Sequence, residues 1–195
     1  MTPRTDPAET MLVDTDGIAV RFGDLKANPL VVVLVRFFGS PTCQSFVSDV
    51  SDAVASRRFP RSARVVAIGG SSHEQARAFR YDHGVNVPFL VDPEQAIRTL
   101  ARVGDLGRGL FSFRGAQNHA AAKRDGMSPA KPTPPRDARR SPGVAFFGPE
   151  MDLRWVHEGE FVGDYPTIDQ LVGQVAAEVV TPRTAERVNI LAARR

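Results

Sequence analysis

Residues 30–35 read Leu-Val-Val-Val-Leu-Val, an unbroken run of branched aliphatic side chains. A strand with one wet face alternates apolar and polar residues, whereas a strand covered on both faces does not. The run therefore predicts a central strand in a sheet with helices packed on both of its sides. This directs the chain to the α/β class.

Strand-type and helix-type patterns alternate along the rest of the chain. Asp16-Gly17 between two short apolar runs indicates an N-terminal hairpin. Further apolar runs predict strands at 64–68, 87–91, 143–147 and 153–157. Helical spacing and capping residues predict helices over 43–55, after Ser71 or Ser72, from Asp92 to about Ala101, and over 165–179. The order predicts a partly parallel sheet that ends in an antiparallel hairpin and a closing helix.

One segment departs from this pattern. Residues 104–141 are basic, rich in Gly, Pro and Ser, and poor in apolar residues after Phe113. We expect a long, partly disordered insertion. Most such segments are solvated loops; the alternatives are a contact with nucleic acid or an acidic partner, for which the segment lacks a folded motif, and a lid over a site. The expected organisation is a flexible tail over 1–10, one domain over 11–180 and a basic tail over 181–195.

Composition narrows the class of protein. The net charge of +3 does not call for nucleic acid, and the longest apolar run is too short to span a bilayer. The single cysteine, Cys43, excludes an internal disulfide and a cysteine-based zinc site, and the histidines have no metal-ligand spacing. A lone cysteine without an apolar leader fits the reducing cytoplasm, and we expect no bound metal or cofactor.

Cys43 is placed at the start of a helix by the residues before it. In Ser40-Pro41-Thr42-Cys43, serine suits the N-cap and proline the first helical position. We expect the Ser40 hydroxyl to accept a hydrogen bond from the Cys43 backbone N–H. The helix dipole there favours the thiolate, which is the nucleophilic form. The alternative is that Cys43 is a small buried apolar residue.

Arg36 follows the central strand at its carboxyl end, where open α/β sheets bind ligands. Its guanidinium would stabilise a thiolate or an anionic substrate there, or would cover an aromatic ring at the surface.

The segment VVVLVRFFGSPTCQ resembles the VVxFxRxFGCPxCR segment of peroxiredoxin-like proteins in the alkyl hydroperoxide reductase/thiol-specific antioxidant superfamily, particularly the selenoprotein U and prostamide synthase branch. Residues 86–93 resemble that family's cis-proline strand and the helix start after it, and residues 143–155 its later hairpin. The resemblance implies a thioredoxin-like three-layer α/β/α fold with an N-terminal hairpin extension and the basic insertion before the last hairpin.

The resemblance also implies a set of site residues. Cys43, Ser40 and Arg36 would be catalytic, and a cis peptide bond at Pro88 would face the cysteine loop. The substrate-binding residues would be Thr42, Pro41, Phe38, Val87 and Pro88.

Three departures from the family pattern matter. Ser40 stands where the family has the first cysteine of C-x-x-C. Arg36 stands where it has a proline before the cysteine, and Pro142 where it has an arginine before the later strand. A one-cysteine thiol oxidoreductase, of peroxidase or reductase type, would therefore depend on an external thiol or a thioredoxin-type protein.

Two other hypotheses stay open. One is a scaffold recruited to non-redox chemistry on a specialised metabolite. The other is a binding protein that has lost its redox dithiol. In each, the partner is a small molecule, with neither nucleic acid nor membrane, and a homodimer is compatible with the resemblance.

Overall fold

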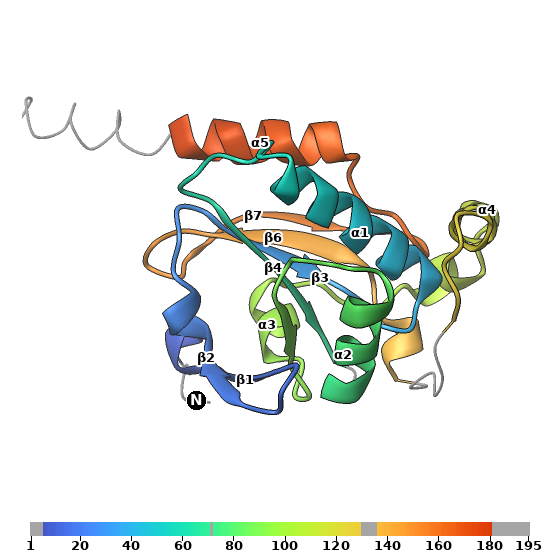
Figure 1. Cartoon of the computed structure of the whole chain (residues 1–195), viewed down its shortest axis with the longest axis horizontal. Helices are drawn as coiled ribbons and strands as arrows, with labels where there is room; N and C mark the ends of the chain where they lie inside the picture. The colour runs from blue at the N-terminus through green and yellow to red at the C-terminus, as the bar shows by residue number, and fades with distance from the viewer. Residues whose placement is uncertain (1–5, 71, 130–135, 181–195) are drawn as a thin grey trace, which may run out of the picture.

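The computed structural model describes residues 6–70, 72–129 and 136–180. Its centre is a seven-stranded sheet with the order β2-β1-β5-β4-β3-β6-β7 (Figure 1). The strands β3, β4 and β5 pair in parallel, and the other pairs are antiparallel. The strands are β1 Met11–Asp14, β2 Ala19–Arg21, β3 Leu30–Leu34, β4 Arg64–Gly69, β5 Phe89–Val91, β6 Gly143–Phe147 and β7 Leu153–Glu158.

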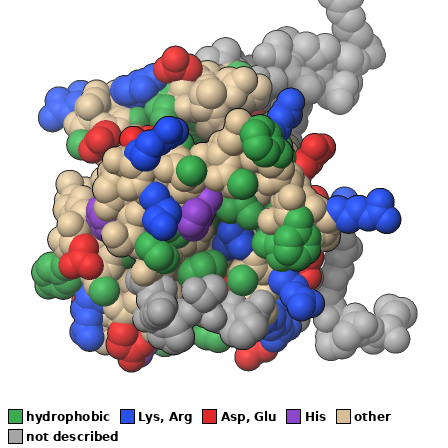
Figure 2. Space-filling model, turned by 90° about the vertical axis from the view of Figure 1, so that its right-hand side faces the viewer, with side chains coloured by type: hydrophobic (Ala, Val, Ile, Leu, Met, Phe, Trp, Pro, Cys, Tyr) green, Lys and Arg blue, Asp and Glu red, His purple; other side chains and the backbone are tan. Residues whose placement is uncertain are grey.

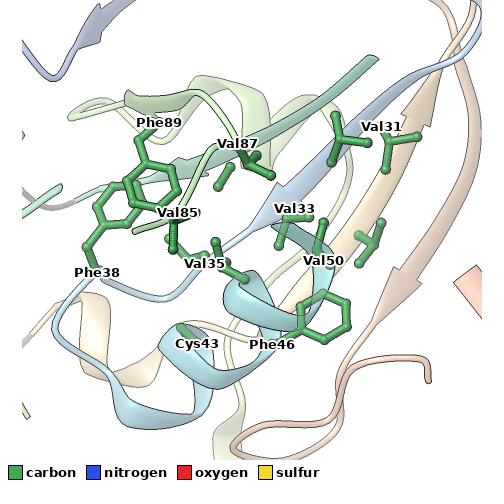
Figure 3. Close-up of a cluster of buried hydrophobic side chains, with 14 of the residues drawn as sticks. Val31, Val33, Val35, Phe38, Cys43, Phe46, Val50, Val85, Val87 and Phe89 are labelled. Atoms are coloured by element: carbon green, nitrogen blue, oxygen red, sulfur yellow. The ribbon is translucent and has the colours of Figure 1, made fainter. Parts of the chain in front are cut away.

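Strand β3 is the middle of the sheet, as its apolar run predicts. All five of its residues are buried, and it pairs with β4 on one side and β6 on the other. Val31 and Val33 point into one hydrophobic core (Figure 3). Leu30, Val32 and Leu34 point into a second core on the opposite face.

The two cores are covered by different elements. The first lies under helices α1 (Pro41–Ala55), α2 (His73–Asp82) and α5 (Ile168–Val180). The second lies under α3 (Ala96–Leu100) and the short 3-10 helix η2 (Phe22–Leu25). The predicted three-layer α/β/α arrangement with an N-terminal hairpin is thus observed. No helix among the described residues is both long enough and apolar enough to cross a membrane.

The described part of the segment expected as an N-terminal tail includes a short helix. Within the described part of residues 1–10, Pro7–Glu9 form a 3-10 helix η1, in which the Asp6 carboxylate accepts a hydrogen bond from the Ala8 N–H. The predicted C-terminal tail, 181–195, lies outside the described residues.

The insertion contains helices that the sequence analysis does not predict. They are the 3-10 helix η3 (Gly107–Phe111), α4 (Phe113–Arg124) and the 3-10 helix η4 (Asp137–Arg139). Helix α4 buries only Gly115 and Ala122, so it lacks the apolar stripe by which a helix is recognised. The sequence feature that marks the start of α4 is the N-cap residue Ser112, whose hydroxyl accepts a hydrogen bond from the Gly115 N–H at 2.9 Å. Residues 130–135 of the insertion lie outside the described part.

Two helices begin later than predicted. Helix α3 starts at Ala96 rather than beside Asp92, whose carboxylate instead accepts a hydrogen bond from the Ile97 N–H at 2.8 Å. The closing helix α5 starts at Ile168, so Tyr165 lies in the loop before it.

Because the sheet is buried on both faces, truncating a core side chain should lower the stability of the protein. We expect Ile68→Ala, in the second core, to lower the free energy of unfolding by about 2–5 kcal/mol, because it leaves a cavity. Ile18→Ala is the matched control: Ile18 is 62% exposed, and its truncation should change stability by less than about 0.5 kcal/mol. Urea denaturation measures both, and equal effects would contradict the assigned core.

Candidate functional site

Cys43 lies in the first turn of α1, at the third helical position. Ser40 is the N-cap and Pro41 the first helical residue, as predicted. The prediction that the Cys43 N–H donates to the Ser40 hydroxyl is wrong: the Ser40 side chain accepts no capping hydrogen bond. Its hydroxyl instead lies 3.3 Å from the Thr42 hydroxyl. The sequence therefore locates the helix start correctly, while Ser40 uses its side chain for a neighbour in the same turn.

The sulfur of Cys43 is directed into the protein. Cys43 is 1% exposed and belongs to the first hydrophobic core, together with Val33, Val35 and Phe46 (Figure 3). An apolar environment by itself favours the thiol over the thiolate. Any reactivity therefore depends on the polar groups that reach the sulfur.

One such group is the hydroxyl of Tyr165. It lies 3.4 Å from the Cys43 Sγ and 3.3 Å from the backbone oxygen of Leu34. The hydroxyl has one proton, which it donates to one of these acceptors at a time. Donation to the sulfur would stabilise a thiolate over a thiol.

The Tyr165 ring is held in place by packing. It stacks on Phe46 of α1, with ring centroids 4.1 Å apart and planes 3° from parallel. Burial raises the pKa of Tyr165 well above its ordinary value, and the neighbouring Cys43 raises it further. Tyr165 therefore keeps its proton and remains a donor. Sequence analysis missed it because it lies 122 residues from Cys43, in a segment assigned to a helix.

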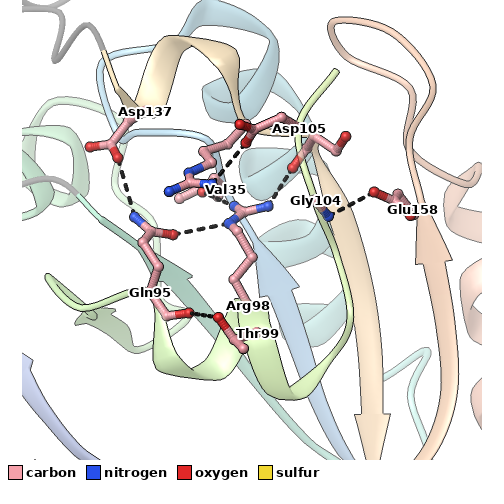
Figure 4. A network of polar contacts seen from close by, with 10 residues as sticks. Val35, Gln95, Arg98, Thr99, Gly104, Asp105, Asp137 and Glu158 are labelled. Carbon is pink, nitrogen blue, oxygen red and sulfur yellow. Dashed lines mark hydrogen bonds and ion pairs between the residues drawn. The ribbon is translucent and has the colours of Figure 1, made fainter. Parts of the chain in front are cut away.

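A buried arginine, Arg98 of α3, supplies positive charge near this pair. Its side chain donates to the Gln95 side chain at 3.0 Å, to the Ser141 carbonyl at 2.5 Å and to the Val35 carbonyl at 2.9 Å (Figure 4). Burial lowers the pKa of Arg98, whereas its neighbours Tyr165 and Cys43 raise it. Arg98 therefore lies within electrostatic range of both Tyr165 and Cys43.

Arg98 also lies beside one departure from the family pattern. The arginine expected where this chain has Pro142 is absent there, yet the Arg98 guanidinium binds the adjacent residue, Ser141, from α3. Sequence analysis missed it because an arginine in a short helix is normally solvated.

Arg36 lies in the loop after β3 and is 6% exposed. Its Nη2 donates to the backbone oxygen of Ala138 in η4, and its guanidinium lies 5.8 Å from the centre of the Phe37 ring. Arg36 thus lies over an aromatic ring, but it is buried by the insertion rather than placed at the surface, and its action on a thiolate or an anionic substrate stays a prediction.

A cavity of about 530 Å³ opens between the start of α1 and the insertion. Figure 2 shows the face that carries α4, where hydrophobic side chains surround a hollow beside histidine and basic side chains. The cavity is lined by Arg36, Phe37, Gly39, Ser40, Pro41, Leu110, Phe111, Ser112, Gly115, Ala116, His119, Pro129, Ala138 and Val162. The structure thus brings Arg36, Ser40 and Pro41 to one cavity, whose lining does not include Cys43.

The other expected substrate-binding residues lie elsewhere. Thr42 lines a smaller cavity of about 210 Å³ with Tyr165. Phe38 is buried and stacks on Phe89, and Val87 is buried in the first core (Figure 3).

The cis peptide bond expected at Pro88 is wrong. Of the described residues, only Asn28-Pro29 has a cis bond, so the bond before Pro88 is trans. Pro88 instead leads into β5, and its carbonyl accepts a hydrogen bond from the Ala67 N–H of β4 at 2.9 Å. A short strand whose proline carbonyl pairs in this way has the same sequence pattern as a cis-proline strand.

The histidines have separate surroundings. His83 is the C-cap of α2, His157 bonds the Asp164 carbonyl at 3.0 Å, and His119 lines the larger cavity. Within the described ranges, no three His, Cys, Asp or Glu side chains are grouped as metal ligands would be.

Comparison with known proteins gives a family match. The sequence model of the AhpC/TSA family matches residues 5–113, more than half of the chain. This range contains the start of α1, Arg36 and Arg98, and it ends where α4 begins. No curated protein matches the chain in sequence.

Solved structures with similar folds include peroxiredoxins and disulfide oxidoreductases. The bacterioferritin comigratory protein of Xanthomonas campestris, described for its alkyl peroxide reduction activity, matches with a TM-score of 0.62 and 11% identity over 89% of this chain and 94% of that chain. Peroxidoxin BcpB of Mycobacterium tuberculosis matches with a TM-score of 0.59 and 16% identity over 86% and 92%. A peroxiredoxin-like protein of Aquifex aeolicus matches with a TM-score of 0.57 and 14% identity over 87% and 83%. At these identities the likeness establishes the thioredoxin-like fold of peroxiredoxins.

Tyr165→Phe tests the hydroxyl at the sulfur. The variant keeps the ring and its stacking but removes the donor, so the thiolate loses a hydrogen bond worth about 1.5–3 kcal/mol. We expect iodoacetamide to alkylate Cys43 at least about tenfold more slowly at neutral pH, as followed by mass spectrometry. The chain's other tyrosine, Tyr81, is 81% exposed, and Tyr81→Phe should leave the rate unchanged. Equal rates in both variants would contradict a hydrogen bond to the thiolate.

Arg98→Lys tests the buried guanidinium. One ammonium group cannot reproduce the directions of the bonds to Gln95, Ser141 and Val35, so buried acceptors are left unpaired. We expect a loss of about 1–3 kcal/mol in the free energy of unfolding, measured by denaturant titration. Arg77→Lys, at an exposed position of α2, should be neutral. A neutral Arg98→Lys would show that these bonds contribute little.

Proposed function

Because the chain belongs to the AhpC/TSA family, we propose that it is a one-cysteine thiol-dependent oxidoreductase in which Cys43 is the nucleophile. The selenoprotein U branch assigned from resemblance stays a prediction. A peroxide is the proposed oxidising substrate.

The observation that carries the proposal is the surroundings of the sulfur. Cys43 is at the first turn of α1, where the helix dipole favours negative charge. The Tyr165 hydroxyl donates to the sulfur, and Arg98 places a cation nearby. A cysteine that served only as an apolar filler would need neither of these groups. This arrangement supports a site that stabilises a thiolate in spite of burial.

The proposed reaction has three balanced steps. The Cys43 thiolate attacks one oxygen of a hydroperoxide, the O–O bond breaks, and the departing alkoxide takes a proton to become an alcohol. Cys43 is left as a sulfenic acid. An external thiol then attacks the sulfenic sulfur and releases water, which leaves a mixed disulfide. A second external thiol displaces Cys43 and forms the external disulfide.

The external reductant follows from the sequence. Ser40 occupies the position of the first cysteine of a C-x-x-C motif, and the chain has no second cysteine to resolve the sulfenic acid. We propose a small thiol or a thioredoxin-type protein as the reductant and the reducing cytoplasm as the compartment. A homodimer also stays a proposal.

Access to the sulfur requires a movement. Because Cys43 is 1% exposed, a peroxide reaches it only after a neighbour shifts. Tyr165 is the natural candidate, since it contacts the sulfur and lies in the loop before α5. Its displacement would open the sulfur toward the smaller cavity, which Tyr165 and Thr42 line.

Chemical trapping tests the nucleophile. We expect the reduced protein, treated with one equivalent of tert-butyl hydroperoxide and dimedone, to carry a dimedone adduct on Cys43. Cys43→Ser should carry no adduct and should no longer consume peroxide with dithiothreitol as the reductant. Circular dichroism confirms that the variant is folded. A wild-type protein without an adduct, or peroxide consumption retained in Cys43→Ser, would overturn the proposal.

A second function is favoured by the burial of Cys43 and its separation from the larger cavity. In this alternative the scaffold binds or transforms a small molecule without thiol chemistry. Activity on such a molecule would survive Cys43→Ala, whereas the thiol reaction would not.

A further inference from the structure

The larger cavity has features that the thiol chemistry does not use. It lies between Ser40 and Pro41 at the start of α1 and the helices of the insertion (Figure 2). The Cys43 sulfur is buried in the core and is absent from the lining. Its volume of about 530 Å³ falls within the range of small-molecule sites.

Arg36 is the charged residue of this cavity. The guanidinium is 94% buried, and Nη2 donates to the Ala138 carbonyl. Its Nε is buried without a hydrogen-bond partner. None of the described carboxylates lies within 4.0 Å of the Arg36 side chain.

The incomplete hydrogen bonding of the Arg36 guanidinium differs from that of the other buried arginine, Arg98. Arg98 is equally buried, but its Nε, Nη1 and Nη2 each have a partner. A buried guanidinium N–H without an acceptor is costly, and an anion bound beside Arg36 would offset that cost. The incomplete pairing of Arg36 therefore points to a negatively charged ligand.

The rest of the lining limits what that ligand is. The walls are mainly apolar: Phe37, Pro41, Leu110, Phe111, Ala116 and Val162. No acidic residue lines the cavity, and Arg36 is its sole lysine or arginine among the described residues. Phe111 is 87% exposed at the cavity, so a bound apolar body would cover it.

His119 of α4 gives the site a second polar contact. Burial lowers the pKa of His119, and the positive charges of Lys123 and Arg36 lower it further. The imidazole is therefore neutral at physiological pH and offers one donor and one acceptor. As far as the described lining residues go, a single cation with a neutral partner matches a monoanion better than a phosphate with two charges.

We propose that this cavity binds a small organic monocarboxylate with an apolar body, whose carboxylate pairs with Arg36 while its body lies against the insertion. The site is distinct from the thiol and goes beyond the oxidoreductase function. The carboxylate of the ligand binds the Arg36 guanidinium, and the apolar side chains of the lining contact the rest of the ligand.

Calorimetry with a matched pair of probes tests the charge preference. We expect octanoate to bind the full chain at neutral pH at least about tenfold more tightly than 1-octanol, which has the same body without the charge. Arg36→Met removes the cation but keeps an apolar stem, and should abolish this preference. Arg108→Met, at an exposed position of the same insertion outside the lining, should retain it.

A blocking variant keeps the test decisive if Arg36→Met does not fold. Ala116 is exposed on α4 and lines the cavity, so Ala116→Trp should fold and fill the space. We expect it to weaken the binding of both probes at least tenfold, with an unchanged circular dichroism spectrum. Equal affinities for the two probes, no binding of octanoate, or unchanged binding in Ala116→Trp would each overturn the proposal.

Cys43→Ala separates this site from the thiol function. The variant cannot form a sulfenic acid, but it should bind octanoate as tightly as the wild type. A protein that binds octanoate and forms no dimedone adduct would refute only the oxidoreductase function. A protein that forms the adduct and shows no preference for octanoate would refute only the carboxylate site.

Discussion

The three hydrogen bonds of the Arg98 guanidinium determine the geometry on which the site depends. They join the end of β3 at Val35, the residue before α3 at Gln95 and the residue Ser141 that leads toward β6. These segments are far apart in sequence, and the loop to Cys43 begins where β3 ends. One buried guanidinium therefore ties the start of that loop to α3 and to the segment before β6, and it lies within electrostatic range of Cys43.

The elements that sequence analysis predicted are those with local signals. The aliphatic run of β3 and the Ser40-Pro41 helix start specify their conformations within a few residues. Tyr165 and Arg98 could not be predicted, because their functions arise only when distant segments are packed together. Helix α4 was missed for a related reason: it packs along α1 and buries few of its side chains, so it carries little apolar periodicity.

The site region has two parts with different structural origins. The surroundings of Cys43 belong to the core of the fold, within the range matched by the AhpC/TSA family. Most of α4 and all of η4, which cover the larger cavity, lie after residue 113 and outside that range. Arg36 connects the two parts, since it follows β3 and donates to Ala138 of η4. Substitutions at Ala116 or His119 therefore alter the cavity without changing the contacts of the sulfur.

The position of the Tyr165 hydroxyl between two acceptors has a dynamic consequence. The Leu34 carbonyl and the Cys43 sulfur are both within reach of one hydroxyl, while the Tyr165 ring is stacked on Phe46. The hydroxyl hydrogen exchanges one acceptor for the other by rotation about the C–O bond of the tyrosine, and the ring can keep its stacking as it does so.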